Sequence, residues 1–435
     1  MCKAIIGMAF GDEGKGGFTD FLASETQAPL LIKCCGGAQA SHTVVLPDGS
    51  RFRFSQLSAG MTAPGAATYL SDNFVVNPFS LAEECRALSE RIGIGRHALA
   101  GSVYLDCKSL TVTRFHRAIN RLEMEQTHAM RGSVGTGVST AAMMARQGYP
   151  TMRAADLFSG KRRAVLLDLQ ACLAAYYGET TGISPELREE IENLLLPEAV
   201  QRLENEYGEL FDDFFFRLCN GVPKDGREII CEGSQGFLLD HRYGTLPNVT
   251  GLDTSAEWVK RRFPKHRIYG ALRVFWSRHG PGAFPSEEEI LRSLFSDDEQ
   301  ELGRYNGRIR YGYFDLVLFR YSVSHNPPDA LALSFVDLLE RYDVIPVCIA
   351  YTCPADVNGE LSKYFETTEE NGQLIIHTIK SLCAEACLVL KRCTPVLTFF
   401  RTPAELFKRL EEESHIPVAL ISSGSGRTKK RWIQT

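Results

Sequence analysis

Short runs of apolar and β-branched residues alternate along the chain with longer segments that carry apolar residues at helical spacing. The short runs predict strands and the longer segments predict amphipathic helices. The predicted strands are residues 4–6, 29–33, 229–231, 330–336, 344–351 and 418–422. The predicted helices are residues 78–92, 164–177, 197–219, 314–325, 374–391 and 404–413. This alternation predicts an α/β fold around a central, mostly parallel sheet.

No linker or fixed-period repeat divides the chain, so residues 1–435 are predicted to form a single large domain. The segment from about 164 to 220 is rich in helical pattern and is predicted to be a helical insertion on that domain. Three of the predicted strands end in glycine-rich turns. Ligands of parallel sheets bind at the carboxyl ends of strands, so these turns are the candidate functional segments.

Composition narrows the class of protein. Hydrophobic residues make up 44% and charged residues 23%, as in ordinary globular proteins. The net charge of −5 lacks the bulk positive charge of a nucleic-acid coat protein, and no apolar run approaches the roughly 18 residues of a membrane helix. The 13 cysteines show no C-x-x-C spacing and sit mostly in apolar runs. We therefore expect a cytoplasmic protein that binds neither nucleic acid nor membranes.

The first candidate motif follows the first predicted strand, where residues 7–16 read G-M-A-F-G-D-E-G-K-G. Glycines let backbone N–H groups turn toward an anion, and Lys15 adds a positive charge. A standard P-loop would have glycine in place of Ala9 and Ser or Thr in place of Gly16. Asp12 and Glu13 are unusual beside phosphates unless one of them binds Mg²⁺ or accepts a proton. The alternative is a tight strand-to-helix turn with solvated charges.

The second candidate motif also follows a predicted strand, where residues 36–43 read G-G-A-Q-A-S-H-T. His42 could donate a proton or a hydrogen bond near neutral pH. The alternative is a loop histidine without a chemical role.

The third candidate motif is the segment 232–236, E-G-S-Q-G, followed by G-T-L-P-N-V-T at 244–250. The Gln235 amide both donates and accepts, as recognition of a base edge requires. The alternative is a polar turn.

The fourth candidate motif is the arginine pair Arg308 and Arg310 between two glycines. Two arginines at this spacing on an extended loop could bind a phosphate and a carboxylate. The alternative is a solvated basic loop.

The fifth candidate motif ends a predicted strand, where residues 334–337 read S-F-V-D. The Asp337 carboxylate could accept hydrogen bonds from N1 and N2 of guanine. The alternative is a helix N-cap.

In order and spacing, these blocks resemble the adenylosuccinate synthetase family from residue 7 to about 427. The matching segments are 11–16 (G-D-E-G-K-G), 36–43, 232–240, 244–250, 282–287, 307–310 and 421–424. The resemblance implies a P-loop-NTPase-like domain. It also implies a ligase of purine biosynthesis that joins L-aspartate to C6 of IMP through a 6-phosphoryl intermediate, with GTP and Mg²⁺, and that acts as a homodimer. The alternatives are a nucleotide-binding sensor or partner protein, and a variant ligase that uses another purine nucleotide or ATP.

The resemblance implies a role for each matching residue. Asp12 would be the base at purine N1, His42 the acid toward O6, and Lys15 and Gln235 would assist. The Asp12 carboxylate and the Ser41 carbonyl would hold Mg²⁺. The implied nucleoside-triphosphate site comprises Gly11, Asp12, Glu13, Gly14, Lys15, Gly16, Ser41, His42, Thr43, Arg310, Ser334, Asp337, Ser422 and Gly424. The implied purine-nucleotide site comprises Gln39, Ser133, Arg146, Gln235, Thr250 and Arg308, with Arg146 reaching across from the partner subunit. The implied aspartate site comprises Asn306, Arg308 and Arg310.

The chain also departs from the family pattern. Gln39 replaces an asparagine, Val134 a threonine and Thr136 an arginine, all around the 5′-phosphate of the substrate. Phe335 replaces the lysine beside the guanine, and His279 replaces a valine. The catalytic pair is kept while the recognition residues change. IMP, GTP and aspartate remain the expected substrates, and the alternative is a diverged ligase with another purine, donor nucleotide or amino acid.

Overall fold

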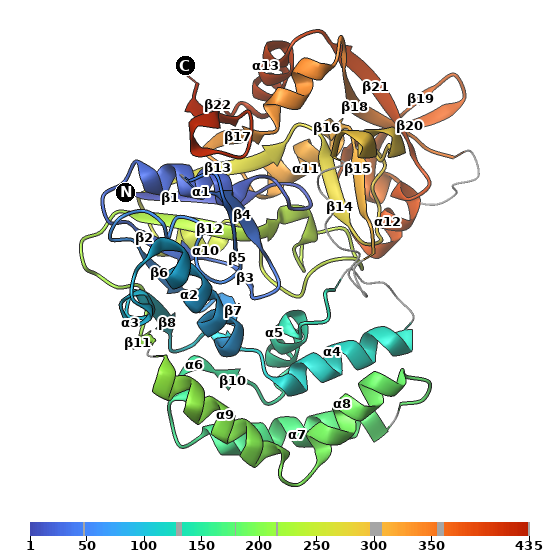
Figure 1. Ribbon diagram of the computed structural model, residues 1–435. Coiled ribbons are helices and arrows are strands. Elements are labelled where there is room, and N and C mark those ends of the chain that lie inside the picture. Colours follow the sequence, from blue (N-terminus) through green and yellow to red (C-terminus); the bar gives the residue numbers. More distant parts are fainter. Residues whose placement is uncertain are drawn as a thin grey trace.

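The computed structural model describes residues 1–46, 48–127, 133–178, 180–214, 216–295, 307–354 and 361–433. Its main feature is a ten-stranded sheet in the order β11-β8-β6-β2-β12-β1-β13-β17-β22-β23 (Figure 1). These strands are, in the same order, Arg217–Cys219, Val103–Asp106, Ala67–Leu70, Leu30–Lys33, Ile229–Gly236, Cys2–Gly7, His266–Arg273, Ala330–Ser334, Val418–Ser422 and Lys430–Trp432. All neighbours pair in parallel except β22 and β23. The predicted α/β fold with a mostly parallel sheet is confirmed.

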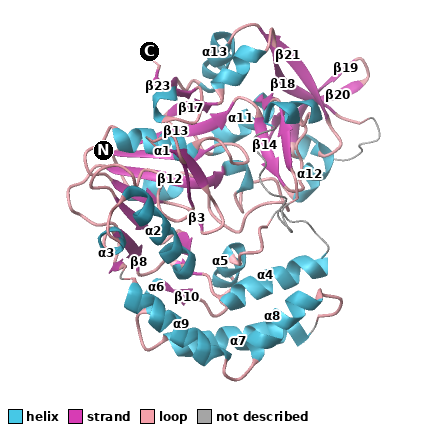
Figure 2. Cartoon of the chain, in the orientation of Figure 1, coloured by secondary structure: helices cyan, strands magenta, loops and turns pink. Residues whose placement is uncertain are grey.

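Helices cover this sheet and build a separate layer at the bottom of Figure 1 (Figure 2). The helices are Lys15–Ser24 (α1), Pro78–Ile92 (α2), Arg96–Ala100 (α3), Arg114–Thr127 (α4), Val138–Arg146 (α5), Ala154–Leu157 (α6), Arg162–Gly178 (α7), Pro185–Leu195 (α8), Ala199–Asp213 (α9), Glu257–Arg262 (α10), Leu316–His325 (α11), Ala384–Leu390 (α12) and Pro403–Ser414 (α13). The bottom layer comprises α4, α7, α8 and α9, which pack against one another. No helix among the described residues is long and apolar enough to span a membrane.

Smaller sheets flank the central one. One contains Met152–Arg153 (β10), Leu110–Thr111 (β9), Phe74–Val76 (β7) and Gly36–Gly37 (β3). Another contains Phe314–Asp315 (β16), Ile345–Thr352 (β18), Gln373–Ile379 (β20), Phe365–Glu370 (β19) and Thr394–Phe400 (β21). Two-stranded ribbons pair His42–Val45 (β4) with Arg51–Phe54 (β5), and Trp276–His279 (β14) with Ile309–Gly312 (β15). Short 3₁₀ turns are Phe237–Leu239 (η1), Glu289–Phe295 (η2), Val336–Arg341 (η3), Leu361–Lys363 (η4) and Arg427–Lys429 (η5).

Two of the predicted helices are partly wrong. The helix predicted over 197–219 ends at Asp213, and Arg217–Cys219 instead forms the edge strand β11. Two aromatic side chains, Phe214 and Phe216, are buried there, and aromatic residues at alternate positions favour an extended chain. The helix predicted over 374–391 is a strand in its first half, and its helical part is only Ala384–Leu390.

Candidate functional site

A cavity of about 550 Å³ lies at the carboxyl ends of the central strands, where the glycine loops meet. Loops after β1, β2, β12 and β13 supply most of its wall, and α4 and α5 close one end. The predicted site residues that line it are Gly11, Asp12, Glu13, Gly14, Lys15, Gly16, Gln39, Ser41, His42, Thr43, Ser133, Arg146, Gln235 and Thr250. Those that do not line it are Ser334, Asp337, Ser422, Gly424, Arg308 and Arg310.

Glu13 has an internal role in the first loop. Its carboxylate is fully buried and accepts hydrogen bonds from the Ala9 N–H and the Lys15 ammonium, each at 2.6 Å. A Cβ atom at Gly7 would lie 2.1 Å from this carboxylate, so only glycine leaves room for it. Glu13 therefore shapes the loop and neutralises part of the charge of Lys15, rather than presenting its carboxylate to a bound phosphate.

Asp12 stands in the left-handed region with φ of 55°, which turns its side chain toward the cavity. Its Oδ2 accepts a hydrogen bond from His279 Nε2 at 2.9 Å. Burial alone would raise the pKa of Asp12, but His279, Arg273 and Lys15 together hold this pKa well below its usual value. Asp12 is therefore ionised at neutral pH, as a proton acceptor or a metal ligand must be.

His42 is oriented by the carboxylate of Glu232, a buried residue within strand β12. Its Nδ1 makes a short hydrogen bond to Glu232 Oε1. Glu232 Oε2 accepts from the Ser58 hydroxyl at 2.5 Å and from the Ala59 N–H at 3.0 Å, and Lys33 Nζ lies 3.6 Å from Oε1. Glu232 lay inside a predicted block, but sequence reasoning gave it no role because its partner is 190 residues away.

The charges around His42 and Glu232 determine which of the two groups is ionised. Burial would raise the pKa of Glu232, but Lys33 and His42 lower it well below the usual range. Burial lowers the pKa of His42, helped by Lys33 and Lys15 and opposed by Glu232. His42 is therefore neutral in the empty cavity, with Nδ1–H donating to Glu232 and Nε2 left for a ligand.

Four cavity-lining side chains have buried polar atoms without a hydrogen-bond partner among the described residues. These are both amide atoms of Gln39, Oε1 of Gln235, and the hydroxyl oxygens of Thr250 and Thr140. Buried polar groups are normally paired, so unpaired ones that surround one cavity indicate a polar ligand there. Gln39, Gln235 and Thr250 were predicted, whereas Thr140 on α5 carried no sequence signal.

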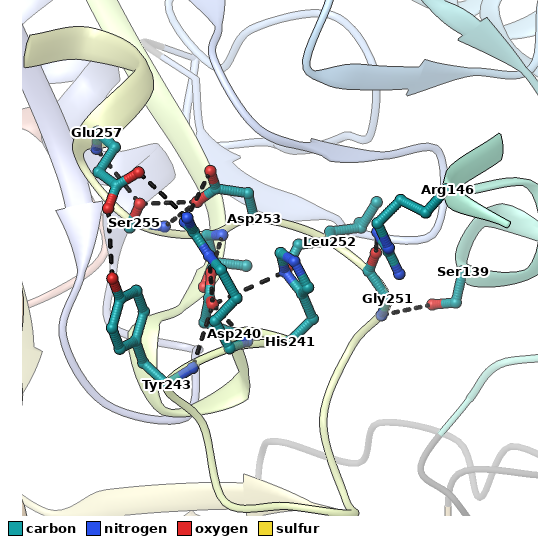
Figure 3. Close-up of polar contacts among 12 residues, drawn as sticks. Ser139, Arg146, Asp240, His241, Tyr243, Gly251, Leu252, Asp253, Ser255 and Glu257 are labelled. Atoms are coloured by element: carbon teal, nitrogen blue, oxygen red, sulfur yellow. Dashed lines mark hydrogen bonds and ion pairs between the residues drawn. The ribbon is translucent and has the colours of Figure 1, made fainter. Parts of the chain in front are cut away.

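Arg146, the last residue of α5, lines the cavity of its own chain. Its Nη1 donates to the Gly251 carbonyl at 2.5 Å, beside Ser139, as Figure 3 shows. Its predicted reach into a partner subunit stays a prediction.

In the turn before α5, the polar groups bond to one another and to Asn120 of α4. The Ser133 hydroxyl donates to Asn120 Oδ1 at 3.0 Å and accepts from Gly135 N–H at 3.2 Å. The Gly137 N–H also donates to Asn120 Oδ1. Val134 is 41% exposed and offers no polar atom beyond its backbone. This turn therefore directs few donors at the cavity.

The predicted base-binding residues of the triphosphate site lie farther along the same sheet edge. Ser334 and Ser422 end the neighbouring strands β17 and β22. Oδ1 of Asp337, in η3, is buried without a partner among the described residues. Phe335 lines the cavity, and the Arg273 guanidinium lies 4.1 Å from its ring centroid.

The arginine side chains that were predicted to bind aspartate do not line the cavity. Arg310 donates to the carbonyls of Gly280 and Gly282, at 3.1 and 2.8 Å, and to Glu287 at 2.8 Å. Its guanidinium is thus held by the segment that follows β14, and of strand β15 only Ile309 lines the cavity. Asn306 lies outside the described residues.

Comparisons with known proteins agree with this geometry. The model of the adenylosuccinate synthetase family matches residues 4–431. The chain is 28% identical to adenylosuccinate synthetases of Chlorobium phaeovibrioides (98% of this chain, 96% of that one) and Rhodococcus jostii (97% and 96%). Its fold is similar to fully ligated adenylosuccinate synthetase from Plasmodium falciparum, with a TM-score of 0.74, 19% identity and coverage of 99% of each chain. It is also similar to cyanophage S-2L succinoaminodeoxyadenylate synthetase, with a TM-score of 0.58, 16% identity and coverage of 100% of this chain and 95% of that one. The chain thus belongs to the adenylosuccinate synthetase family and is a ligase of that type.

Proposed function

We propose that this ligase joins L-aspartate to C6 of a purine nucleotide, IMP or a close analogue, and that GTP hydrolysis with Mg²⁺ drives the reaction. One observation carries the proposal: an ionised carboxylate, Asp12, and a carboxylate-oriented imidazole, His42, flank Lys15 in a single cavity. A carboxylate, an imidazole and an ammonium group are what deprotonation and phosphorylation of a purine 6-oxo group require.

The 6-oxo group is a poor leaving group, so it is first phosphorylated. Asp12 takes the N1 proton, and the negative charge that develops on O6 attacks the γ-phosphorus while GDP leaves. The neutral amine of aspartate then adds to C6, the C6–O bond breaks, and inorganic phosphate departs with the proton that the amine loses. Each step exchanges one bond for another and needs no oxidant or reductant.

His42 and Lys15 stabilise the transferring phosphoryl group. The ammonium of Lys15 is a fixed positive charge at the loop. The negative charge of bound phosphates favours protonation of His42, and Glu232 stabilises the imidazolium through Nδ1. Because the pair is already aligned, little reorganisation accompanies the reaction.

The residues present fit Mg²⁺. Asp12 Oδ1 makes no hydrogen bond to any described residue, so this carboxylate oxygen can serve as a ligand, and the Ser41 carbonyl belongs to the same cavity. No three His, Cys, Asp or Glu side chains within the described chain form a complete metal site. Mg²⁺ is usually held by one or two carboxylates together with substrate phosphates, which matches this sparse donor set. When bound, it would neutralise charge between the phosphates.

A second candidate function is a variant ligase with another purine nucleotide or ATP as donor. Two observations favour it. The Ser133 hydroxyl, predicted to bind the purine nucleotide, is already hydrogen-bonded within the protein. In addition, Phe335 replaces the lysine that is expected beside the donor base. The structurally similar phage enzyme is bound to dGMP and to dATP as an energy donor, so this fold accommodates such ligands.

The test is phosphate release by the purified protein across a panel of purine nucleotides, GTP or ATP, and Mg²⁺, with and without aspartate. Release that needs both the purine nucleotide and the amino acid supports a ligase. Release without the amino acid indicates a phosphotransferase or NTPase, and no release with any combination indicates a binding protein.

A further inference from the structure

The ammonium group of Lys430 donates all three of its hydrogen bonds to a single turn. Its Nζ donates to the carbonyls of Gly424, Ser425 and Gly426, at 3.2, 2.9 and 3.0 Å. A lysine ammonium has three N–H donors, so this turn uses all of them. Lys430 begins β23, pairs with Ser422 of β22, and is only 7% exposed. Burial lowers the pKa of Lys430 to about 8, opposed by Asp20.

Lys430 reaches the turn by passing over a glycine of the phosphate-loop helix α1. A Cβ atom at Gly17 would lie 2.8 Å from Lys430 Cε and 3.1 Å from Nζ. Glycine inside a helix is less favourable than alanine, and the space that the lysine needs explains its presence here. Gly17 itself lines the cavity.

Because the three carbonyls point at Lys430, they also determine where the backbone N–H groups of the turn point. The C=O and N–H of a trans peptide point in opposite directions, so carbonyls that converge on Lys430 direct the N–H groups of Ser425 and Gly426 away from it. Neither N–H has a hydrogen-bond partner among the described residues. Asp337, whose Oδ1 is also unpaired, lies in η3, which contacts β22. Two backbone N–H donors and one carboxylate acceptor without partners among the described residues therefore follow the adjacent strands β22 and β17.

We propose that Lys430 is a positioning residue for the donor nucleotide: through the gap at Gly17 it holds the 424–426 turn in the shape that receives the base of the nucleoside triphosphate. The proposal rests on the proposed function, and on the resemblance that places Ser422 and Gly424 in the triphosphate site.

Loss of Lys430 should loosen the turn without detaching the C-terminal segment. Arg427 donates to both carboxylate oxygens of Asp20 in α1, at 2.7 and 2.6 Å, and to the Thr62 hydroxyl. This second attachment is independent of Lys430, so variants at Lys430 are expected to fold.

The test compares Lys430→Met, which keeps the length of the side chain but has no donor, with Gly17→Ala, which fills the gap. Each is expected to raise the Kd and the KM for GTP by about tenfold. In Lys430→Met, which lies outside the cavity, the KM values for the purine nucleotide and aspartate, and kcat, should stay within about threefold. The double variant should be no worse than either single one, because both remove the same contact. The matched control is Gly208→Ala in α9, where a Cβ atom meets nothing within 4 Å, and it should bind GTP as the wild type does.

Direct titration with GTP and with ATP separates this inference from the proposed function. If the wild type binds a triphosphate and Lys430→Met binds it tenfold less tightly, the inference holds even when no ligase product forms. Unchanged triphosphate affinity in Lys430→Met overturns it. Equal loss for every ligand, or an additive double variant, also overturns it, since Lys430 would then be merely structural. A wild type that binds no triphosphate overturns both.

Discussion

Two side chains reach the cavity, Asp12 from the loop after β1 and His42 from the start of β4. Each handles a proton in the proposed reaction, and positioned acid–base groups typically contribute about 10²–10⁴-fold. We therefore predict that Asp12→Ala and His42→Ala each lower kcat by at least about 10², measured by product formation under saturating substrates. Near-wild-type turnover in either variant, with unchanged melting temperature, would refute the assigned role.

His116 makes a prediction about acid stability. It is fully buried, and its Nδ1 accepts from the Thr113 N–H at 3.1 Å, so the ring is neutral with its proton on Nε2. Burial lowers the pKa of His116 to about 4 from 6.5. The unfolded chain therefore binds this proton first, and the free energy of unfolding falls as the pH drops from about 6.5 toward 4, by up to about 3 kcal/mol.

The variant His116→Asn keeps an acceptor near the Nδ1 position but cannot be protonated. We expect its free energy of unfolding to fall by about 2–3 kcal/mol less than that of the wild type between pH 7 and pH 4.5, measured by urea denaturation. Parallel losses in the two proteins would show that other groups cause the acid sensitivity.

At this scale the sequence predicted residue types better than partners. Asp12, Lys15 and His42 stood out because charged groups beside glycine turns are unusual. Glu232 was given no role, and His279 was noted only as the replacement of a valine, although both end up beside the two proposed acid–base groups. Their roles depend on contacts across 190 and 267 residues, which neither spacing nor periodicity encodes.

At the scale of elements, the helix predicted over 374–391 shows where periodicity misleads. Asn371 and Gly372 both have positive φ, at 50° and 74°, and connect β19 to β20 as a hairpin. An Asn-Gly pair between two strands is a strong hairpin signal, and the β-branched run that follows it fits a strand. The strands at 4–6, 29–33 and 418–422 were predicted well because they are short, buried and bounded by turns.

The 334–337 segment carries a prediction about the donor nucleotide. In the proposed site Asp337 would accept hydrogen bonds from guanine N1 and N2, whereas adenine presents an acceptor at N1, so we expect GTP to be preferred over ATP. Phe335 in place of lysine should reduce this preference for GTP over ATP. Asp337→Ala should raise the KM for GTP by about 10- to 100-fold and leave that for ATP nearly unchanged, because a hydrogen bond to a charged group contributes about 1.5–3 kcal/mol. Competition kinetics that favour ATP in the wild type would reject guanine recognition.

At the scale of the whole molecule, the proposed homodimer predicts complementation between two inactive variants. Arg146→Ala removes the arginine that would serve the partner's site, and Asp12→Ala removes the base of its own site. A mixed dimer then contains one intact site, so activity should return when the two variants are mixed and allowed to exchange subunits.

The structure makes this experiment decisive. Arg146 lines the cavity of its own chain and contacts Gly251 there. If Arg146 serves only its own site, no mixed dimer has an intact site, and stable mixed dimers stay inactive. Mixing two samples of Asp12→Ala is the control for exchange itself.

The central claim is that the 6-oxo group leaves as phosphate. IMP carrying ¹⁸O at the 6-position, incubated with GTP, Mg²⁺, aspartate and the protein, tests it directly by mass spectrometry of the released phosphate. The proposed route predicts one ¹⁸O atom in each phosphate and a purine product without the label. Unlabelled phosphate, with the label retained in the purine, would contradict the 6-phosphoryl intermediate.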